Sequence, residues 1–297
     1  MYDIIIVGAG PAGMTAALYA KRANKKVLIF ESKTYGGQIV NTPVIENYPG
    51  IPDISGFDYA TNLYNQIISL GCEIKFEPVI RIEDDLTVIT PKNKYVAKSI
   101  ILATGAENRK LKLENEEKFI GKGISYCATC DGNFYKNKTV AVNGGGNTAL
   151  EDAIYLSNIA KKVYLIHRRD EFRGENKYIE DVRNKNNIEL ILKSTITKII
   201  GDNKLKSIEI TSIDNKKQQI EVDGLFIAIG QTPNNEVFKN IIDVSKEGYI
   251  ISEDGVHTTK KNIYVAGDTR IKDLRQLTTA VSDGAIAATT AIKEMED

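Results

Sequence analysis

The sequence is poor in the residues that build disulfide frameworks and metal sites. Its 297 residues include three cysteines, two histidines and no tryptophan. Three cysteines are too few for a disulfide scaffold. A structural zinc site needs four ligands, usually as two close pairs. Cys127 and Cys130 form one such pair, but Cys72, His167 and His257 are isolated in the sequence, so zinc is a minor alternative.

An excess of either charge and a long hydrophobic run are also missing. Lysine plus arginine equals aspartate plus glutamate at 39 each, so nothing favours nucleic acid or an anionic membrane as a partner. Apolar runs such as 4–7 and 225–229 are far too short to span a membrane. No basic segment followed by a long apolar one marks a secretory signal. We therefore expect a cytoplasmic protein.

The sequence does contain one glycine-rich pattern twice, Gly8-Ala9-Gly10-Pro11-Ala12-Gly13 and Gly144-Gly145-Gly146-Asn147-Thr148-Ala149. Each copy follows an apolar strand-like run, at 4–7 and at 139–142, and opens a helix-like stretch. This context is typical of a dinucleotide site, in which the pyrophosphate approaches the helix N-terminus. One copy alone would be weak evidence, and the second could be a tight strand–helix connection without a ligand. Two copies in the same context favour two dinucleotides.

The residues that start 23 positions after the first glycine of each copy differ in charge. Glu31 stands where a carboxylate would accept hydrogen bonds from a ribose diol, whereas the second copy has His167, Arg168 and Arg169, followed by Arg173. Guanidinium groups bind phosphate oxygens in a fork, which suits a 2′-phosphate. The alternative is a solvated charge run, but the position directly after an apolar strand favours phosphate recognition. We predict NADPH rather than NADH for the second copy.

The two copies also predict the domain organisation. We expect strands near 2–7, 27–31, 73–77, 86–90 and 98–104, and helices near 12–24 and 56–71. Segments 100–105 and 225–230 each look like a buried strand that ends at a glycine and closes its repeat. The tail contains a further strand at 262–268 and a small-residue helix start at Asp283.

We interpret this tail as completing the first domain. The fold class is then α/β, with two Rossmann-like dinucleotide-binding domains of which the second is inserted into the first. The first would comprise 1–108 plus 236–297, and the second 112–232. Linkers near 107–113 and 230–235 would form a double hinge.

The Cys127–Cys130 pair is spaced to close a small reversible disulfide, and cysteines in such motifs often have a lowered thiol pKa. Asp131 could hold or release the proton that dithiol–disulfide exchange moves, although a role in a turn or helix cap fits equally well. We expect Cys72 to be a small buried residue and His257 to be structural or solvated. Together with the two dinucleotide patterns, the pair indicates a redox enzyme.

These motifs closely resemble the bacterial-type thioredoxin reductase family, the small flavoprotein form, along essentially the whole chain. The matching motifs are the two glycine patterns, Gly36-Gly37-Gln38, Glu46-Asn47-Tyr48-Pro49-Gly50, Ala103-Thr104-Gly105, Cys127-Ala128-Thr129-Cys130-Asp131, His167-Arg168-Arg169-Asp170-x-Phe172-Arg173, Ala266-Gly267-Asp268 and Arg275-Gln276.

The resemblance implies FAD in the first domain and NADPH in the second. The implied FAD-binding residues are Gly8, Gly10, Pro11, Ala12 and Gly13 at the pyrophosphate, Glu31 at the adenosine ribose, and Gly37, Gln38, Asn47, Thr104, Gly105, Gly267, Asp268, Arg275 and Gln276 elsewhere. The implied NADPH-binding residues are Gly144, Gly146, Asn147, Thr148, Ala149, His167, Arg168, Arg169 and Arg173.

The resemblance also implies the reaction, in which electrons pass from NADPH through the flavin to the Cys127–Cys130 disulfide and on to thioredoxin or a thioredoxin-like disulfide protein. Cys130 would face the flavin, Cys127 would attack the partner's disulfide, and Asp131 would serve as acid and base. Family members rotate one domain against the other and form homodimers.

Alternatives stay open at this point. A ferredoxin-dependent flavin thioredoxin reductase lacks an intact nucleotide pattern and basic cluster, and a peroxiredoxin reductase carries an additional N-terminal disulfide domain. A related ferredoxin–NADP reductase lacks the cysteine pair. The chain could also serve another disulfide protein, or be a non-enzymatic dinucleotide sensor, although the intact cysteine pair argues against a sensor.

Overall fold

The computed structural model describes residues 1–252 and 255–296. It divides into two compact units, which we call unit 1 (Met1–Glu107 and Thr232–Asp297) and unit 2 (Asn108–Gln231). Each has a largely parallel sheet with helices, so the predicted α/β class is confirmed. Which nucleotide each unit binds stays a prediction. No helix in the described residues is long and apolar enough to cross a membrane.

Five parallel strands form the centre of unit 1, in the order β3-β2-β1-β6 with β17 on the other edge of β6. They are β1 (Tyr2–Val7), β2 (Val27–Glu31), β3 (Glu73–Phe76), β6 (Lys94–Leu102) and β17 (Ile263–Val265). The first half of β6 pairs antiparallel with β5 (Thr87–Ile89), which pairs with β4 (Arg81–Ile82). The predicted strands are thus present, with ends shifted by up to four residues.

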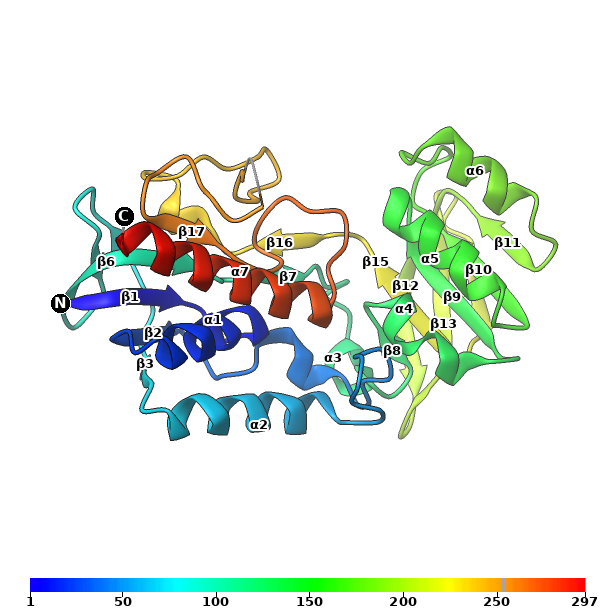
Figure 1. Ribbon diagram of the computed structural model, residues 1–297. Coiled ribbons are helices and arrows are strands. Elements are labelled where there is room, and N and C mark those ends of the chain that lie inside the picture. Colours follow the sequence, from blue (N-terminus) through cyan, green and yellow to red (C-terminus); the bar gives the residue numbers. More distant parts are fainter. Residues whose placement is uncertain (253–254, 297) are drawn as a thin grey trace. The chain divides into compact units, whose positions relative to one another are not determined.

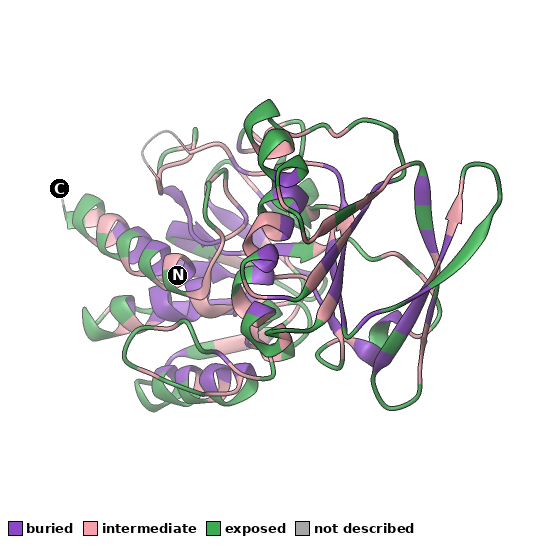
Figure 2. Ribbon diagram, turned by 90° about the vertical axis from the view of Figure 1, so that its right-hand side faces the viewer, coloured by how far each residue is buried: buried purple, intermediate pink, exposed green. Residues whose placement is uncertain are grey.

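Both faces of this sheet are covered, which explains the continuous apolar run of β1. Ile4 and Ile6 pack into the core on the side of α1 (Pro11–Arg22) and α7 (Leu277–Glu296), while Ile5 and Val7 pack into the core on the other side. A strand buried on both faces has no polar alternation. Figure 2 shows buried residues concentrated in the strands.

Helices α1 and α7 lie side by side on one face of the sheet (Figure 1). A Cβ at Gly284 would collide with the carbonyl oxygen of Ala12, so the glycine permits the close approach. The prediction of a helix start at Asp283 is wrong, because the helix already begins at Leu277. The small residues after Asp283 mark the helix-packing contact rather than a helix end. The remaining helices of unit 1 are η1 (Gly37–Asn41), α2 (Gly56–Ser69) and η3 (Glu236–Phe238).

Unit 2 repeats this strand order, as β11-β10-β9-β15-β8, all parallel. Its strands are β8 (Ile124–Ser125), β9 (Thr139–Gly144), β10 (Lys162–Ile166), β11 (Ile188–Ile191) and β15 (Gly224–Ala228). The fifth strand has a different origin in each unit. In unit 1 it is β17 from the C-terminal tail, whereas in unit 2 it is β8, which precedes the glycine turn.

One face of the unit 2 sheet carries a helix and the other carries a second sheet. Helix α5 (Asn147–Ser157) packs on Val140 and Val142, while Ala141 faces an antiparallel sheet of β12 (Ser194–Gly201), β13 (Leu205–Ser212) and β14 (Lys217–Glu221). The short helices are α3 (Glu116–Phe119), α4 (Ala128–Asp131), η2 (Gly132–Tyr135) and α6 (Asn176–Arg183).

The two segments that connect the units pair with each other. They are β7 (Ala106–Asn108) and β16 (Gln231–Pro233), which form a two-stranded sheet. Gly105 precedes β7 with φ +64° and Gly230 precedes β16 with φ +100°. These are left-handed backbone conformations that favour glycine. Each connection therefore begins at a residue whose conformation other side chains disfavour.

Candidate functional site

The first glycine turn joins β1 to α1 in unit 1, and its three glycines have different surroundings. A Cβ at Gly8 would collide with the carbonyl oxygen of Ala103, and one at Gly13 would collide with the carbonyl oxygen of Gly8. Gly10 is different, since the nearest atom to its Cβ position is the Cα of Gly37 at 4.0 Å. Gly8 and Gly13 therefore permit the tight packing of the turn, and Gly10 leaves room for a ligand to approach the backbone.

Glu31 ends β2 beside this turn and is half-buried. Its Oε2 accepts a hydrogen bond from the backbone N–H of Ala9 at 2.9 Å, and its Oε1 accepts one from the backbone N–H of Lys33 at 2.9 Å. A pocket of about 240 Å³ adjoins it, lined among others by Gly8, Glu31 and Thr104. The carboxylate, the turn and the pocket fit the ribose end of a dinucleotide.

Asp268 follows β17 and supplies the clearest sign of a ligand in unit 1. Its Oδ1 is buried and has no hydrogen-bond partner among the described residues. Burial raises the pKa of Asp268 above its usual value, although Lys272 and Arg275 act against that rise. Buried polar atoms in proteins are almost always hydrogen-bonded, so this oxygen marks a place for a donor from outside the chain. The residues of unit 1 thus fit a bound flavin nucleotide.

Asp283 on α7 holds the segment around Asp268, and our sequence analysis missed this role. Its carboxylate accepts hydrogen bonds from the backbone N–H of Gly267 at 3.0 Å, from Arg270 at 3.0 and 3.1 Å, and from Lys272 at 2.8 Å. Burial opposes its ionisation, but the bonds from the two cations prevail and lower the pKa of Asp283. No sequence spacing signals this contact, because it depends on how α7 packs.

Other predicted FAD residues come together from distant segments of unit 1. Asn47 donates its side-chain Nδ2 to Oε1 of Gln276 at 3.1 Å. The guanidinium of Arg275 lies 4.3 Å from the ring centre of Tyr249 and donates to the carbonyl oxygen of Arg270 at 3.3 Å. Gln38 is exposed on η1, next to Gly37, whose φ is +61°. Pro11 and Ala12 begin α1, and Thr104 and Gly105 follow β6.

The second glycine turn joins β9 to α5 and, like the first, has one glycine in tight packing and another with open space beside it. A Cβ at Gly144 would collide with the carbonyl oxygen of Ala228, whereas no atom of the described residues lies within 4 Å of the Cβ position of Gly146. Ala149, at the position of Gly13, is buried, and its Cβ lies 2.6 Å from the Cβ position of Gly144. In the second turn the space for a ligand is therefore at Gly146, as it is at Gly10 in the first turn.

His167 lies over this turn and is buried rather than part of a solvated cationic cluster. A Cβ at Gly145 would collide with its ring, which stacks on Phe172 with centroids 5.5 Å apart. Burial lowers the pKa of His167, so the imidazole is neutral at pH 7. Its Nε2 has no hydrogen-bond partner among the described residues. The imidazole ring therefore packs between Phe172 and the glycine turn.

The arginines of the same loop are exposed beside it. Arg168, Arg169 and Arg173 form no salt bridge with a carboxylate in the part of the chain that the structure describes. The backbone N–H of Arg173 donates to the carbonyl oxygen of Gly145 at 2.7 Å and ties the loop to the turn. Asn147 is exposed at the start of α5, next to Thr148, and accepts a hydrogen bond from the N–H of Glu175 at 2.8 Å. This arrangement fits NADPH, with the arginines at the 2′-phosphate.

Cys127 and Cys130 form a disulfide with an S–S distance of 2.08 Å at the start of α4. The backbone N–H of Cys130 donates to Sγ of Cys127 at 3.2 Å, and the hydroxyl of Ser125 accepts from the N–H of Cys127 at 3.0 Å. Both cysteines are half-buried, as a reactive pair requires. Cys72 is buried and free, as predicted, and burial raises the pKa of its thiol to about 11.

Asp131 is the last residue of α4, and its backbone N–H donates to the carbonyl oxygen of Cys127 at 3.2 Å. Tyr135 lies near it. Burial and the charges of Asp131 and Asp223 raise the pKa of Tyr135 to about 12, so its phenol stays protonated. Asp131 is thus on the same short helix as the disulfide, where a proton-transferring group is useful.

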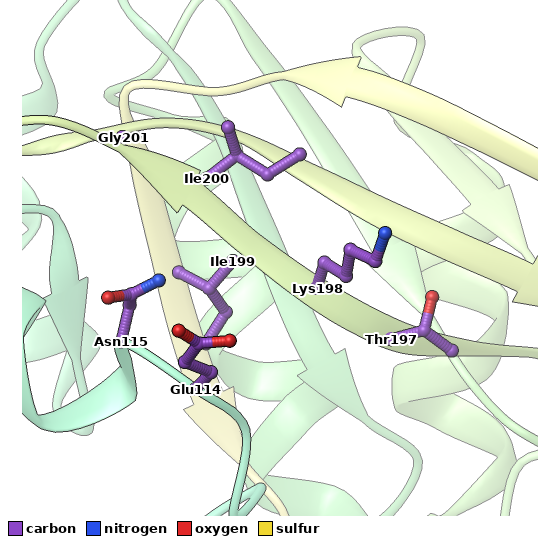
Figure 3. Close-up of a pocket in the computed structure, with 7 residues that line it drawn as sticks. All are labelled: Glu114, Asn115, Thr197, Lys198, Ile199, Ile200 and Gly201. Atoms are coloured by element: carbon purple, nitrogen blue, oxygen red, sulfur yellow. The ribbon is translucent and has the colours of Figure 1, made fainter.

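A second pocket, of about 420 Å³, lies elsewhere on unit 2 (Figure 3). Its lining residues are Glu114, Asn115, Thr197, Lys198, Ile199, Ile200 and Gly201. None of them belongs to the glycine turn, the basic loop or the cysteine pair. The pocket therefore lies outside the predicted site.

Comparison with known proteins identifies the chain. A family model described as pyridine nucleotide-disulphide oxidoreductase matches residues 2–284. The chain belongs to this family. Within it, the chain is 42% identical to the thioredoxin reductase of Mycoplasma genitalium over 97% of its own length and 93% of the relative, and 40% identical to that of Listeria innocua over 100% and 95%.

The solved structures agree with these sequence matches. The thioredoxin reductase of Streptococcus pyogenes superposes with a TM-score of 0.95 at 40% identity, over 100% of this chain and 98% of that one. The resemblance to thioredoxin reductases inferred from the motifs is therefore confirmed. The chain is a flavoprotein oxidoreductase of this family, whose thioredoxin reductases use FAD and NADPH.

Proposed function

We propose that this chain uses NADPH to reduce the disulfide of thioredoxin or of a thioredoxin-like protein. The observation that carries the proposal is the Cys127–Cys130 disulfide, which lies in the same unit as a glycine turn flanked by three exposed arginines. A cysteine pair that cycles between disulfide and dithiol needs a source of electrons, and a nucleotide site in the same unit supplies one. The relatives named thioredoxin reductase support the choice of acceptor.

Unit 1 would hold FAD, and unit 2 would hold NADPH. In unit 1 the pyrophosphate would approach the backbone at Gly10, Glu31 would bind the adenosine ribose, and Asp268 would accept a hydrogen bond through its buried Oδ1. Bound FAD would carry an electron pair from NADPH to the Cys127–Cys130 disulfide. In unit 2 the pyrophosphate would approach Gly146, and the exposed arginines would bind the 2′-phosphate.

The remaining predicted residues keep the roles expected from the resemblance. Around FAD they are Gly8, Pro11, Ala12, Gly13, Gly37, Gln38, Asn47, Thr104, Gly105, Gly267, Arg275 and Gln276. Around NADPH they are Gly144, Asn147, Thr148, Ala149, His167, Arg168, Arg169 and Arg173. His167 would act by shaping the floor of the site, because its ring is buried against Gly145.

The cysteines would exchange disulfides with the partner in two steps. The Cys127 thiolate attacks one partner sulfur, which forms a mixed disulfide and releases the first partner thiol. Cys130 then attacks Cys127, which restores the Cys127–Cys130 disulfide and releases the second partner thiol. The N–H of Cys130, which lies 3.2 Å from Sγ of Cys127, would stabilise the attacking thiolate. Asp131 would hold the proton that the exchange moves.

The paired linkers would let the units change their relative orientation during turnover, as the family resemblance implies. A change is needed because the nicotinamide, the disulfide and the partner protein all require access in turn. We further propose that the chain acts as a homodimer in the cytoplasm.

The test is NADPH oxidation by the purified flavoprotein, with and without thioredoxin in its disulfide form, and with NADH in parallel. Thioredoxin-dependent turnover that prefers NADPH is the expected result. Flavin reduction without thioredoxin turnover would instead indicate another disulfide partner. Failure of both nucleotides to reduce the flavin would contradict the proposal and favour ferredoxin as the donor or a non-enzymatic sensor.

A further inference from the structure

Three oxygen atoms from distant segments of unit 1 meet in its interior. Oδ1 of Asn235 accepts from the hydroxyl of Thr104 at 2.8 Å and from that of Thr269 at 2.7 Å. The two hydroxyl oxygens are 2.7 Å apart. Asn235 is 1% exposed and Thr269 is 0% exposed, so water does not replace these contacts. We call this group the Asn235 cluster.

Asn235 uses its entire hydrogen-bonding capacity in this cluster. Its Nδ2 donates to the carbonyl oxygen of Gly248 at 2.9 Å and to that of Thr269 at 3.1 Å, while Oδ1 accepts the two hydroxyl protons. The side-chain amide has two donors and one oxygen with two lone pairs, so nothing is left over. Each threonine hydroxyl has one proton and donates it to Oδ1 of Asn235, so neither hydroxyl donates to the other. The cluster therefore depends on Asn235 more than on either threonine.

The residues of the Asn235 cluster lie next to both segments that connect the units. Thr104 directly precedes Gly105 and β7, where the chain leaves unit 1. Asn235 follows β16, where the chain returns, and its carbonyl oxygen accepts from Phe238 at 3.0 Å as η3 begins. Thr269 follows Asp268, whose Oδ1 has no hydrogen-bond partner among the described residues and belongs to the proposed flavin site. The cluster thus joins the outgoing connection, the returning connection and the flavin-binding segment.

We propose that Asn235 is a positioning residue, which fixes both connections between the units to the flavin-binding segment. This proposal rests on the proposed function, in which electrons move between groups held by different units. Whatever orientations the units adopt, the two connections start from one point of unit 1, beside Asp268. Loosening that point leaves the chemistry within each unit intact and slows the steps that require both units.

Hydrogen exchange tests the anchoring itself, without turnover. In Asn235→Ala, amides of 104–108, 231–235 and 267–271 should exchange about tenfold faster or more than in the parent, because these segments lose shared hydrogen bonds. The matched control is Asn187→Ala in unit 2. Asn187 also donates its Nδ2 to two carbonyl oxygens, of Ser157 at 2.8 Å and of Ala160 at 3.3 Å. If only one connection responds in Asn235→Ala, or if both respond equally in the control, the anchor assignment is wrong.

Rapid kinetics then tests the positioning role, with rates expressed per bound FAD. In Asn235→Ala, flavin reduction at saturating NADPH should slow by about tenfold, since small misplacements of reacting groups are costly. The NADPH concentration that gives half the maximal rate and the direct reduction of the flavin by dithionite should stay within about twofold of the parent. An unchanged reduction rate at saturating NADPH would overturn the proposal.

A milder variant keeps the test decisive if Asn235→Ala does not fold. Thr104→Val removes one hydroxyl and leaves every other bond of Asn235 in place, so exchange should rise at 104–108 and not at 231–235. Equal exchange in the parent and in Thr104→Val at 104–108 would contradict the anchor. If NADPH fails to reduce the parent flavin, the proposed function fails, while the exchange measurements still decide on the cluster.

Discussion

Asp283 accepts a hydrogen bond from the backbone N–H of Gly267 at 3.0 Å, although the two residues come from a helix and from a turn after a strand. The same carboxylate neutralises Arg270 and Lys272, whose side chains are 16% and 6% exposed. The Asp283 carboxylate therefore holds the turn before Asp268 and balances two largely buried cationic side chains. Removing its charge affects both the fold of unit 1 and its flavin site.

Asp283→Asn should lower the free energy of unfolding by about 3 kcal/mol, because it leaves two largely buried cationic side chains without their counter-charge. It should also weaken FAD binding, measured as flavin absorbance per protein after dialysis. Urea unfolding measures the stability. Asp84→Asn is the control, since Asp84 pairs with Lys260 at the surface and exposed pairs contribute at most about 1 kcal/mol. Equal losses in the two variants would contradict this assignment.

The same carboxylate predicts an acid dependence of stability. The folded-state pKa of Asp283 is lowered, so its contribution is complete above the unfolded carboxyl pKa of about 4 and is lost as the pH falls through the folded value. The parent protein should lose stability below about pH 4 more steeply than Asp283→Asn. Thermal unfolding across this range measures it, and parallel pH curves for the two proteins would contradict it.

In the second turn, a substitution at the crowded Gly144 should affect stability, whereas one at the open Gly146 should affect NADPH binding. Gly144→Ala should destabilise unit 2 strongly, because its Cβ would collide with the carbonyl oxygen of Ala228. In Gly146→Ala the new Cβ would have no atom of the described residues within 4 Å, at a φ of −102°, so the free energy of unfolding should change by about 1 kcal/mol or less. Its apparent Kd for NADPH should nevertheless rise, since the methyl group occupies the side open to a pyrophosphate. Fluorescence titration measures this, and unchanged NADPH affinity in Gly146→Ala would argue against the pyrophosphate site.

The exposed arginines should decide between the two nicotinamide nucleotides. Arg168→Ala together with Arg169→Ala should raise KM for NADPH by about tenfold or more, the loss expected for charge-assisted hydrogen bonds, and should leave KM for NADH nearly unchanged. Arg183→Ala, which changes an exposed arginine on α6 of the same unit, is the control. Similar losses with NADPH and NADH would refute the 2′-phosphate assignment.

The cysteine pair should separate the two halves of the reaction. Cys130→Ser should retain flavin reduction by NADPH and abolish thioredoxin reduction, because the disulfide can no longer form. Cys72→Ala should retain both, since that thiol is buried and its pKa is raised to about 11. Stopped-flow absorbance follows the flavin, and a steady-state assay follows thioredoxin. Substantial thioredoxin turnover in Cys130→Ser would rule out the proposed relay.

Sequence periodicity predicted the strands and glycine turns well, because both depend on local patterns. Ile4–Val7 is apolar throughout and is buried on both faces, and Gly8 and Gly144 have the tight surroundings that the turn requires. Patterns of this kind need no knowledge of the partner segments.

The remaining features depend on how separate segments pack against one another. The start of α7 at Leu277 was missed because small residues from Asp283 onward look like a helix start, whereas they pack against α1. The neutral, buried state of His167 depends on Phe172 and Gly145 closing around it. The bonds of Asp283 reach residues 11 to 16 positions away, and those of Asn235 reach residues 13 to 131 positions away, so no pattern of neighbouring residues contains them.

The different origin of the fifth strand sets an order for folding during synthesis. All five strands of the unit 2 sheet lie between Ile124 and Ala228, so the ribosome has made them before β17 and α7. The sheet of unit 1 lacks an edge strand, and α1 lacks its neighbour, until those later segments emerge. The inserted unit can therefore complete its sheet first, while part of the apolar surface of β6 and α1 in unit 1 stays uncovered until β17 and α7 have been synthesised.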